Sequence, residues 1–215
     1  MQRAFGLSIP QRLEEVCDPT RLALLVYDMQ VGILRQLPSP AAIIERVTEV
    51  LDAARQGGYR VFFSRHMSLP NELAGISQLR TAMAWQRLND VSKVRPPFLR
   101  DTPGFQLIPE VAPRASEAIF DKLSMSAFVG TPLEMALRDC GIVALATVGV
   151  ALEVGIEPTV RHAADLGFIP VVVTDACGGR DLEAGERSLA SLAFAGDAMF
   201  TDARTIGGLL RHAGP

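Results

Sequence analysis

The sequence is short of cysteine and has no long apolar run, and each shortage excludes a class of protein. Cys17, Cys140 and Cys177 are the three cysteines of a 215-residue chain. They are too few and too scattered for a disulfide framework or a CxxC zinc site. An odd number of free thiols is typical of a reducing compartment. The apolar runs have the length of strands, far below the ~20 residues that span a bilayer. These features predict a cytoplasmic protein.

Positive charge is also scarce. The formal net charge is −3, and no dense stripe of lysine and arginine stands out, which argues against nucleic acid and anionic membranes as partners. The first 18 residues lack a basic region followed by an apolar stretch, so we expect no signal peptide.

Signals for cofactors and metals are weak as well. Neither GxGxxG nor a Walker pattern follows the first predicted strand. The three histidines, His66, His162 and His212, fall on separate predicted elements, so we predict no metal site and no cofactor. His162 and His212 are expected on helix surfaces. His66 follows a predicted strand, where it would either line a pocket or take a surface or capping role.

Short β-branched runs alternate with helical patterns, which is typical of βαβ units around a parallel sheet. The length and the 48% hydrophobic content suit one compact domain over residues 1–215. Some strands are nearly continuous apolar runs, as expected where helices cover both faces of the sheet. The predicted strands are Leu22–Asp28, Tyr59–Ser64, Glu117–Asp121, Val143–Gly149, Phe168–Thr174 and Ala198–Thr201.

Three helices are predicted between these strands. Apolar residues recur at helical spacing over 43–54, and glycines 57 and 58 end that helix. The string Thr131-Pro-Leu-Glu134 matches a capping box and predicts a helix that closes at Gly141. A third helix covers 153–166, but Pro158 would remove a hydrogen bond from its second turn. Either the helix begins near Pro158 or its first turn is loose.

The stretch from His66 to Phe105 is the least regular part of the chain. We expect a helix near Glu72–Asp90 followed by an extended loop. A connection of this length in a compact domain is usually functional, for example as a pocket lid or a subunit contact.

Polar residues follow several predicted strands, and ligands of open parallel sheets bind at the carboxyl ends of the strands. Asp28 ends the first strand, and Asp121 and Lys122 end the third. Asp28 is either a hydrogen-bonded strand end or a partly buried carboxylate that serves as acid or base. The same ambiguity holds for Lys122, since a lysine after a strand is usually solvated or ion-paired.

Three sequence blocks together carry a resemblance to a known family. They are Asp28-Met-Gln30, the string from Lys122 to Leu133, and Gly149-Val-Ala151 leading into Thr159-Val-Arg-His-Ala163. In order and spacing they resemble the isochorismatase-like (cysteine hydrolase) superfamily over roughly residues 20–202. The resemblance implies a three-layer α/β/α, Rossmann-like fold with a six-stranded parallel sheet in the order 3-2-1-4-5-6. It also implies a homodimer or homotetramer.

The resemblance further implies a catalytic triad of aspartate, lysine and cysteine, and a cis peptide near Val150-Ala151. Asp28 and Lys122 match the first two members. The family's thiol would stand at Gly155, and glycine offers no nucleophile. Cys177 belongs to another block and is expected to be a structural thiol.

Without a thiolate, three hypotheses stay open. In the first, Asp28 is the acid in the hydrolysis of a small anionic enol ether such as isochorismate, while Lys122 orients the substrate's carboxylate and the Gly155 amide binds an anionic oxygen. In the second, Asp28 is a general base that activates water toward a small amide or lactone. In the third, the chain is a catalytically silent relative that binds a metabolite.

Five further residues are predicted to contact the substrate. Arg65 would hold a substrate carboxylate, the alternative being a surface ion pair. The others follow from their places in the three blocks and are Gln30, Phe128, Val150 and Ala151. Glu153 is predicted to be a charge at the N-terminus of its own helix.

Overall fold

The computed structural model describes residues 1–212 and contains a six-stranded parallel sheet. Its strand order, β5-β4-β3-β6-β7-β8, is the predicted 3-2-1-4-5-6 with the six strands counted along the chain. The strands are β3 (Leu22–Tyr27), β4 (Arg60–His66), β5 (Ala118–Lys122), β6 (Ala144–Val150), β7 (Ile169–Gly178) and β8 (Met199–Thr201). Each lies within a few residues of its predicted range except at the end of β7, which continues to Gly178.

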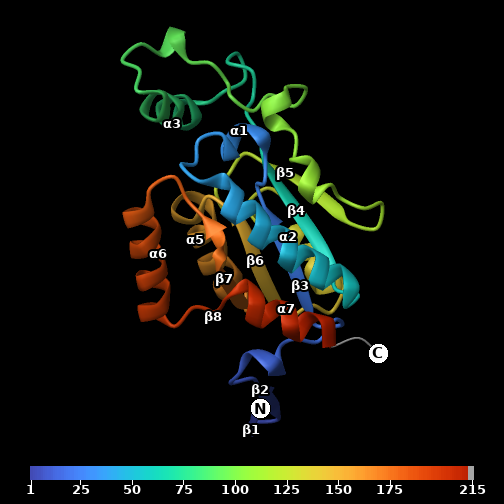
Figure 1. Cartoon of the computed structure of the whole chain (residues 1–215). Coiled ribbons are helices and arrows are strands. Elements are labelled where there is room, and N and C mark those ends of the chain that lie inside the picture. Colours follow the sequence, from blue (N-terminus) through green and yellow to red (C-terminus); the bar gives the residue numbers. More distant parts are fainter. Residues whose placement is uncertain (213–215) are drawn as a thin grey trace.

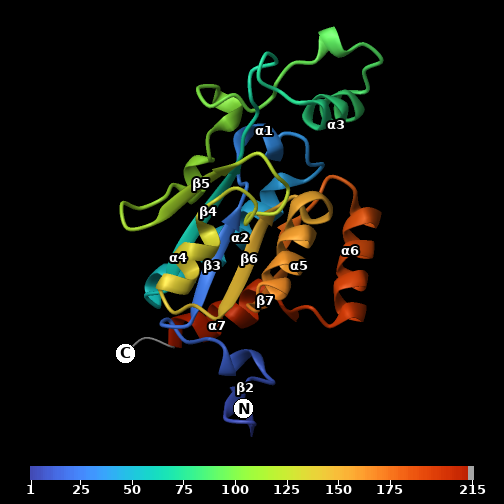
Figure 2. The same ribbon diagram turned by 180° about the vertical axis from the view of Figure 1, so that it is seen from behind.

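Helices cover both faces of this sheet and make three layers (Figures 1 and 2). One face is covered by α2 (Pro40–Gln56) and α7 (Ala203–His212). The other is covered by α4 (Leu133–Asp139), α5 (Glu157–Asp165) and α6 (Leu182–Ala195). The predicted α/β/α class is therefore confirmed.

The central strand β3 shows how the sequence makes two cores. All six of its side chains are buried. Because successive side chains of a strand point to opposite faces, Leu22, Leu24 and Val26 join the core under α2 and α7. Ala23, Leu25 and Tyr27 join the core under α4 and α5. This alternation directs the large Tyr27 ring toward the α5 layer.

The segment with Pro158 resolves its predicted conflict by changing helix type. Residues Leu152–Ile156 form a π-helical turn, η5, and α5 then begins at Glu157 with Pro158 in its first turn. Proline is tolerated there because the first N–H groups of an α-helix have no acceptor within the helix. Both predicted alternatives, a loose first turn and a helix that begins near Pro158, describe part of the outcome.

The predicted capping box at Thr131 is only partly formed. The Thr131 hydroxyl accepts from the Leu133 N–H at 3.3 Å, and the helix begins at Leu133. The Glu134 carboxylate does not return to Thr131; it accepts from Arg138, one helical turn further on. The helix still closes at Gly141, which has φ +72°.

Residues 68–97, here called the arm, project from the carboxyl end of the sheet (Figure 1). The arm contains α3 (Ile76–Gln86), shorter than the predicted Glu72–Asp90 helix. Its two ends are joined where the Ser68 N–H donates to the Phe98 carbonyl at 2.9 Å. The short helix α1 (Val31–Leu34) lies beneath it.

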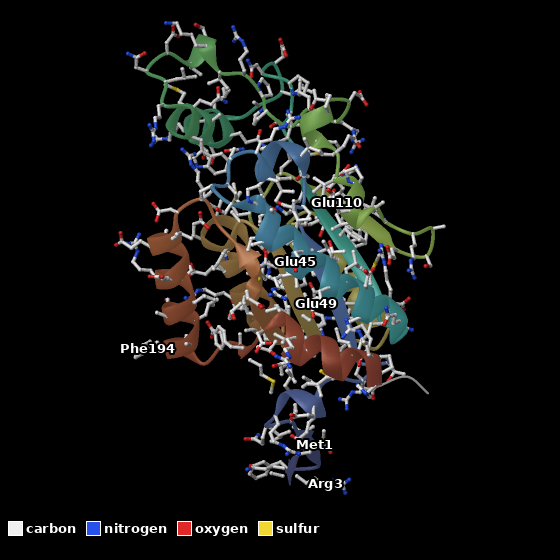
Figure 3. All side chains as sticks on the ribbon, viewed as in Figure 1. Met1, Arg3, Glu45, Glu49, Glu110 and Phe194 are labelled. Atoms are coloured by element: carbon white, nitrogen blue, oxygen red, sulfur yellow. The ribbon has the colours of Figure 1, made fainter. Side chains whose placement is uncertain are left out.

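The opposite end of the molecule carries an element that the sequence patterns did not predict. Strands β1 (Gln2–Ala4) and β2 (Leu7–Ile9) pair antiparallel in a small hairpin. Figure 3 places Met1 and Arg3 at this end, away from the arm. Among residues 1–212, no helix combines the length and the apolar character needed to cross a membrane.

Candidate active site at the carboxyl end of the sheet

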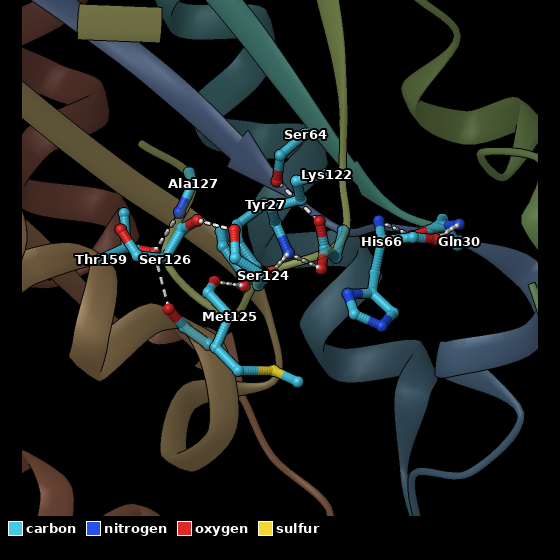
Figure 4. A network of polar contacts seen from close by, with 12 residues as sticks. Tyr27, Gln30, Ser64, His66, Lys122, Ser124, Met125, Ser126, Ala127 and Thr159 are labelled. Carbon is cyan, nitrogen blue, oxygen red and sulfur yellow. Dashed lines mark hydrogen bonds and ion pairs between the residues drawn. The ribbon is translucent and has the colours of Figure 1, made fainter. Parts of the chain in front are cut away.

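The centre of the candidate site is a buried ion pair between two neighbouring strand ends. The Lys122 ammonium donates to Asp28 Oδ2 at 2.7 Å, and the Lys122 side chain is 0% exposed. The other carboxylate oxygen, Oδ1, accepts from the Ser64 hydroxyl at 2.6 Å. Figure 4 shows Lys122 and Ser64 close together in this polar network. Both oxygens of Asp28 are therefore held as acceptors.

The backbone around Asp28 directs its side chain into this cluster. Asp28 follows β3 with φ +48°, a left-handed conformation that only a few per cent of non-glycine residues adopt. The Asp28 N–H donates to the Ser64 carbonyl at 3.1 Å, which continues the pairing of β3 with β4 by one residue. The chain thus turns out of the sheet directly after its last ladder contact, as often occurs at functional sites.

Lys122 is enclosed by groups that it already contacts. Besides Asp28, its ammonium donates to the Ser124 carbonyl at 3.3 Å and lies 4.3 Å from the centre of the Tyr27 ring. Burial lowers the pKa of Lys122, and the Asp28 carboxylate opposes the shift. In this structure Lys122 is the counter-ion of Asp28, and its contact with a substrate carboxylate stays a prediction.

A cavity of about 810 Å³ opens beside Asp28. Tyr27, Asp28, Ala151 and Gly155 line the end of the cavity at the sheet, and the arm lines the opposite side with a mixture of apolar and polar side chains. The cationic residues along it are Arg95 and Arg180. The cavity is therefore a pocket of small-molecule size with Asp28 at its polar end.

The turn after β6 brings Ala151 and Gly155 to the cavity. The Val150-Ala151 peptide is cis, as the resemblance implied, but Val150 itself is 0% exposed in the core, so its predicted contact with substrate is wrong. The Gly155 N–H donates to the Ala151 carbonyl at 2.9 Å. The amide is thus already paired within its own turn, and its binding of an anionic oxygen stays a prediction.

Three other predicted contacts lie outside the cavity lining among residues 1–212. The Gln30 amide bonds to the backbone of His66 and Phe105 and holds the chain together. Arg65 donates to Asp121 at 2.8 Å and stacks over Phe105, since strand alternation turns it to the face opposite Ser64. Phe128 is buried against Phe168 and His162.

The sequence patterns missed Tyr27 as a cavity residue and left the role of His66 open. Tyr27 had the appearance of an ordinary core residue of β3, and only its position next to Asp28 could have signalled it. His66 lines the cavity between Trp85 and Phe98. Burial, and next the charge of Lys122, lowers the pKa of His66 to about 4, so its ring is neutral at pH 7.

Glu153 lies in the first turn of η5, as predicted, and also makes contacts that the sequence did not predict. Its carboxylate accepts from the Arg180 N–H at 2.9 Å and from the Asp181 N–H at 3.3 Å. Glu153 thus ties its own turn to the loop before α6, where Asp181 is the N-cap.

The cysteines and the remaining histidines lie away from the chemistry. Cys177 is buried at the end of β7, a segment expected to be a loop, and burial raises its pKa to about 12. His162 contacts the Ser126 hydroxyl at 2.9 Å instead of lying free on a helix surface. Across residues 1–212, no group of three or more histidine, cysteine, aspartate or glutamate side chains is placed to hold a metal ion.

The sheet order, the buried Asp28–Lys122 pair and the cavity beside it define an α/β protein with a small-molecule site at the strand ends. A family profile, Isochorismatase domain, matches residues 22–205. The chain therefore belongs to the isochorismatase family, whose characterised relatives include hydrolases.

Similar proteins are found at low identity. Ureidoacrylate amidohydrolase RutB of Serratia proteamaculans is 27% identical over 193 residues, which cover 81% of this chain and 77% of that protein. A cysteine hydrolase from Pseudomonas syringae has a TM-score of 0.78 at 23% identity, covering 91% and 95% of the two chains. N-carbamoylsarcosine amidase from Thermoplasma acidophilum has a TM-score of 0.70 at 21% identity, covering 85% and 96%. At these identities the two structures support the fold alone.

Proposed function

We propose that this chain is a small-molecule hydrolase that works without a covalent intermediate, with Asp28 as the general base that activates water. The observation that carries the proposal is the acceptor geometry of Asp28 at the cavity. Both carboxylate oxygens already accept, one from Lys122 and one from Ser64. An ionised carboxylate is an acceptor only, so this arrangement suits a group that takes a proton.

The same geometry is less favourable to the hypothesis of an enol ether. There, Asp28 would have to donate a proton to carbon, whereas in this structure both of its oxygens accept hydrogen bonds, from Lys122 and from Ser64. Isochorismate therefore ranks below a substrate with a carbonyl carbon that water can attack. The amidohydrolase relative supports a small amide, and a lactone remains the chemical alternative.

The cavity restricts how an anionic substrate would bind. Because Lys122 and Arg65 are already paired with Asp28 and Asp121, an anionic group of the substrate would meet Arg180 or Arg95 instead. The reacting carbonyl would lie at the polar end, beside Asp28, and the apolar part against the arm.

A panel of ureido acids, N-carbamoyl amino acids, lactones and isochorismate tests the proposal. We expect turnover of a carbonyl substrate, and Asp28→Asn should lower kcat by about 10²–10⁴-fold, the usual contribution of a general base. Asp121→Asn is the matched control, since Asp121 pairs with Arg65 and Arg100 outside the cavity, and it should retain nearly full activity. Turnover of isochorismate alone would instead support the acid hypothesis.

Two further measurements address the missing covalent step. Intact-protein mass spectrometry during turnover should show no acyl adduct. Iodoacetamide should leave activity intact, because Cys177 is buried with a pKa of about 12. Loss of activity traced to Cys177 and prevented by substrate would contradict the proposal. No turnover of any member of the panel would support the catalytically silent relative.

A further inference from the structure

Tyr27, which has a large side chain, and Gly155, which has none, lie against each other at the polar end of the cavity. Tyr27 ends β3 and is 1% exposed, although it lines the cavity. Its hydroxyl donates to the Met125 carbonyl, and Figure 4 shows the two residues together. Gly155 comes from η5, far along the chain, and lies against the same ring.

The tyrosine ring occupies the space of a side chain at position 155. A Cβ built on Gly155 would overlap the Tyr27 hydroxyl oxygen and lie 2.5 Å from Cζ and 2.7 Å from Cε1. Real Cβ atoms essentially never approach other atoms so closely. Any residue larger than glycine at 155 therefore requires Tyr27 to move.

The backbone itself does not require glycine at this position. Gly155 lies in a π-helical turn and has no positive φ, unlike Gly149, which has φ +125°. Glycine is needed in a helical turn only for close approach. The contact with Tyr27 is that close approach.

The Tyr27 ring also lies next to the charged groups of the site. The Lys122 ammonium is 4.3 Å from the ring centre, and Asp28 is the next residue in the chain. Burial, and next the Asp28 charge, raises the pKa of Tyr27 well above its usual range, so the phenol keeps its proton. Its one proton is already donated to the Met125 carbonyl, so Tyr27 fills space at the polar end of the cavity and is not a nucleophile there.

We propose that Tyr27 takes the place of a side chain at position 155. The phenol of Tyr27, which comes from β3, fills the space beside Asp28 and Lys122 that a side chain at 155 would otherwise fill from η5. We call this replacement the steric exchange. Tyr27 thereby sets the size of the reacting end of the cavity. The proposal relies on the proposed function only in taking the Asp28 end of the cavity as the reacting end. Replacing Tyr27 with a small residue would make room there for a thiol at 155.

A set of variants tests the steric exchange without any substrate. We expect Gly155→Cys alone to lower the thermal midpoint by roughly 5 °C, since overpacking a core costs about 1–3 kcal/mol and 1 kcal/mol corresponds to about 2–4 °C at this chain length. Tyr27→Val should reverse most of that loss when the two are combined. Tyr27→Phe is the matched control, because it removes the hydroxyl but keeps the ring, and it should give little rescue.

Thiol labelling provides the second measurement. In Tyr27→Val/Gly155→Cys, iodoacetamide should alkylate position 155 at least about tenfold faster than Cys177, located by peptide mass spectrometry, because a thiolate near Lys122 in an open cavity is more reactive than a buried thiol. Tyr27→Val alone carries the same three native cysteines and supplies the background rate.

Three results would overturn the exchange. The first is a Gly155→Cys variant as stable as the unaltered chain. The second is a Tyr27→Phe substitution that restores the stability of Gly155→Cys as well as Tyr27→Val does. The third is a double variant whose loss of stability is the sum of the losses in Gly155→Cys and Tyr27→Val. If Gly155→Cys fails to fold, Gly155→Ala with and without Tyr27→Val gives the same comparison with a smaller side chain. None of these readouts depends on turnover, so a failure of the proposed hydrolase activity would be seen separately.

Discussion

The two walls of the cavity are built in different ways. At the sheet end, Tyr27, Asp28 and Lys122 are each 3% exposed or less, and every charged group there has a partner. On the arm, α3 has no buried residue, and Leu73 and Ile76 are 69% and 83% exposed. One wall is held by the parallel sheet, and the other is held mainly at its base by Ser68 and Phe98.

Under the proposed function, the sheet end would carry the reacting groups and the arm would contact the rest of the substrate. Groups that transfer protons need fixed positions, and the strand ends provide them. A segment with few buried apolar contacts opens at a lower free-energy cost than the core, so the arm can adapt to a ligand or be covered by another surface. We therefore expect substitutions at the sheet end to be much more damaging than substitutions on the arm.

The largest expected effect on stability comes from breaking the buried ion pair. Lys122→Met leaves the Asp28 carboxylate buried without its counter-ion and should lower the free energy of unfolding by about 3–5 kcal/mol. Urea denaturation measures it. Lys93→Met is the matched control, since the Lys93 side chain is 66% exposed, and it should cost under about 0.5 kcal/mol. A similar cost for both lysines would contradict the contrast between the walls.

A double variant separates charge from packing. In Lys122→Met/Asp28→Asn the buried charge is removed together with its partner, so much of the stability should return. A double variant as unstable as Lys122→Met alone would assign the loss to packing around Tyr27 instead.

An intermediate effect on stability is expected from lowering the pH, through His66, which lies where the two walls of the cavity meet. Its pKa is about 4 in the folded protein, and the ordinary value is 6.5. As the pH falls below 6.5, the unfolded chain binds a proton that the folded chain rejects, so stability falls until the pH reaches about 4. At pH 5 the loss should be about 2 kcal/mol relative to pH 7, at about 1.4 kcal/mol per pH unit.

Chemical denaturation of His66→Gln at both pH values tests this linkage. The variant should lose about 2 kcal/mol less than the unaltered chain between pH 7 and pH 5, because Gln does not titrate. His212→Gln, at an exposed histidine, should keep the original pH dependence. An unchanged dependence in His66→Gln would show that the charges of Lys122 and Asp28, and not His66, dominate it.

Substitutions on the arm are expected to have the smallest effect on the stability of the folded chain. Ile76→Ser should change the free energy of unfolding by under about 0.5 kcal/mol, as usual for an exposed site. We also propose, following the resemblance, that a second copy covers these apolar side chains in a homodimer or homotetramer. Light scattering should then show a smaller oligomer for Leu73→Ser/Ile76→Ser; a monomer for the unaltered chain would contradict this assembly.

The positions of the strands could be predicted from the sequence, because burial on both faces makes strands such as β3 and β6 nearly continuous apolar runs. The order of the strands came from the family resemblance, since an apolar run does not say which strands are neighbours. Asp28 and Lys122 could also be selected as candidates, since parallel topology brings the strand ends to one edge. The resemblance to the family's motif blocks then distinguished them from ordinary polar residues at strand ends. The hairpin near Met1 lacked any such signal: its two strands have three residues each and almost no burial.

Contacts across the sheet, by contrast, were decided by the tertiary structure. Strand alternation turned Arg65 away from the cavity, and the close approach of Asp28 made Lys122 its counter-ion. Gly155 was visible in the sequence as a missing side chain. Only folding shows that Tyr27, 128 positions earlier in the same chain, fills its space, because sequence spacing carries no information about which atoms from distant segments share one volume.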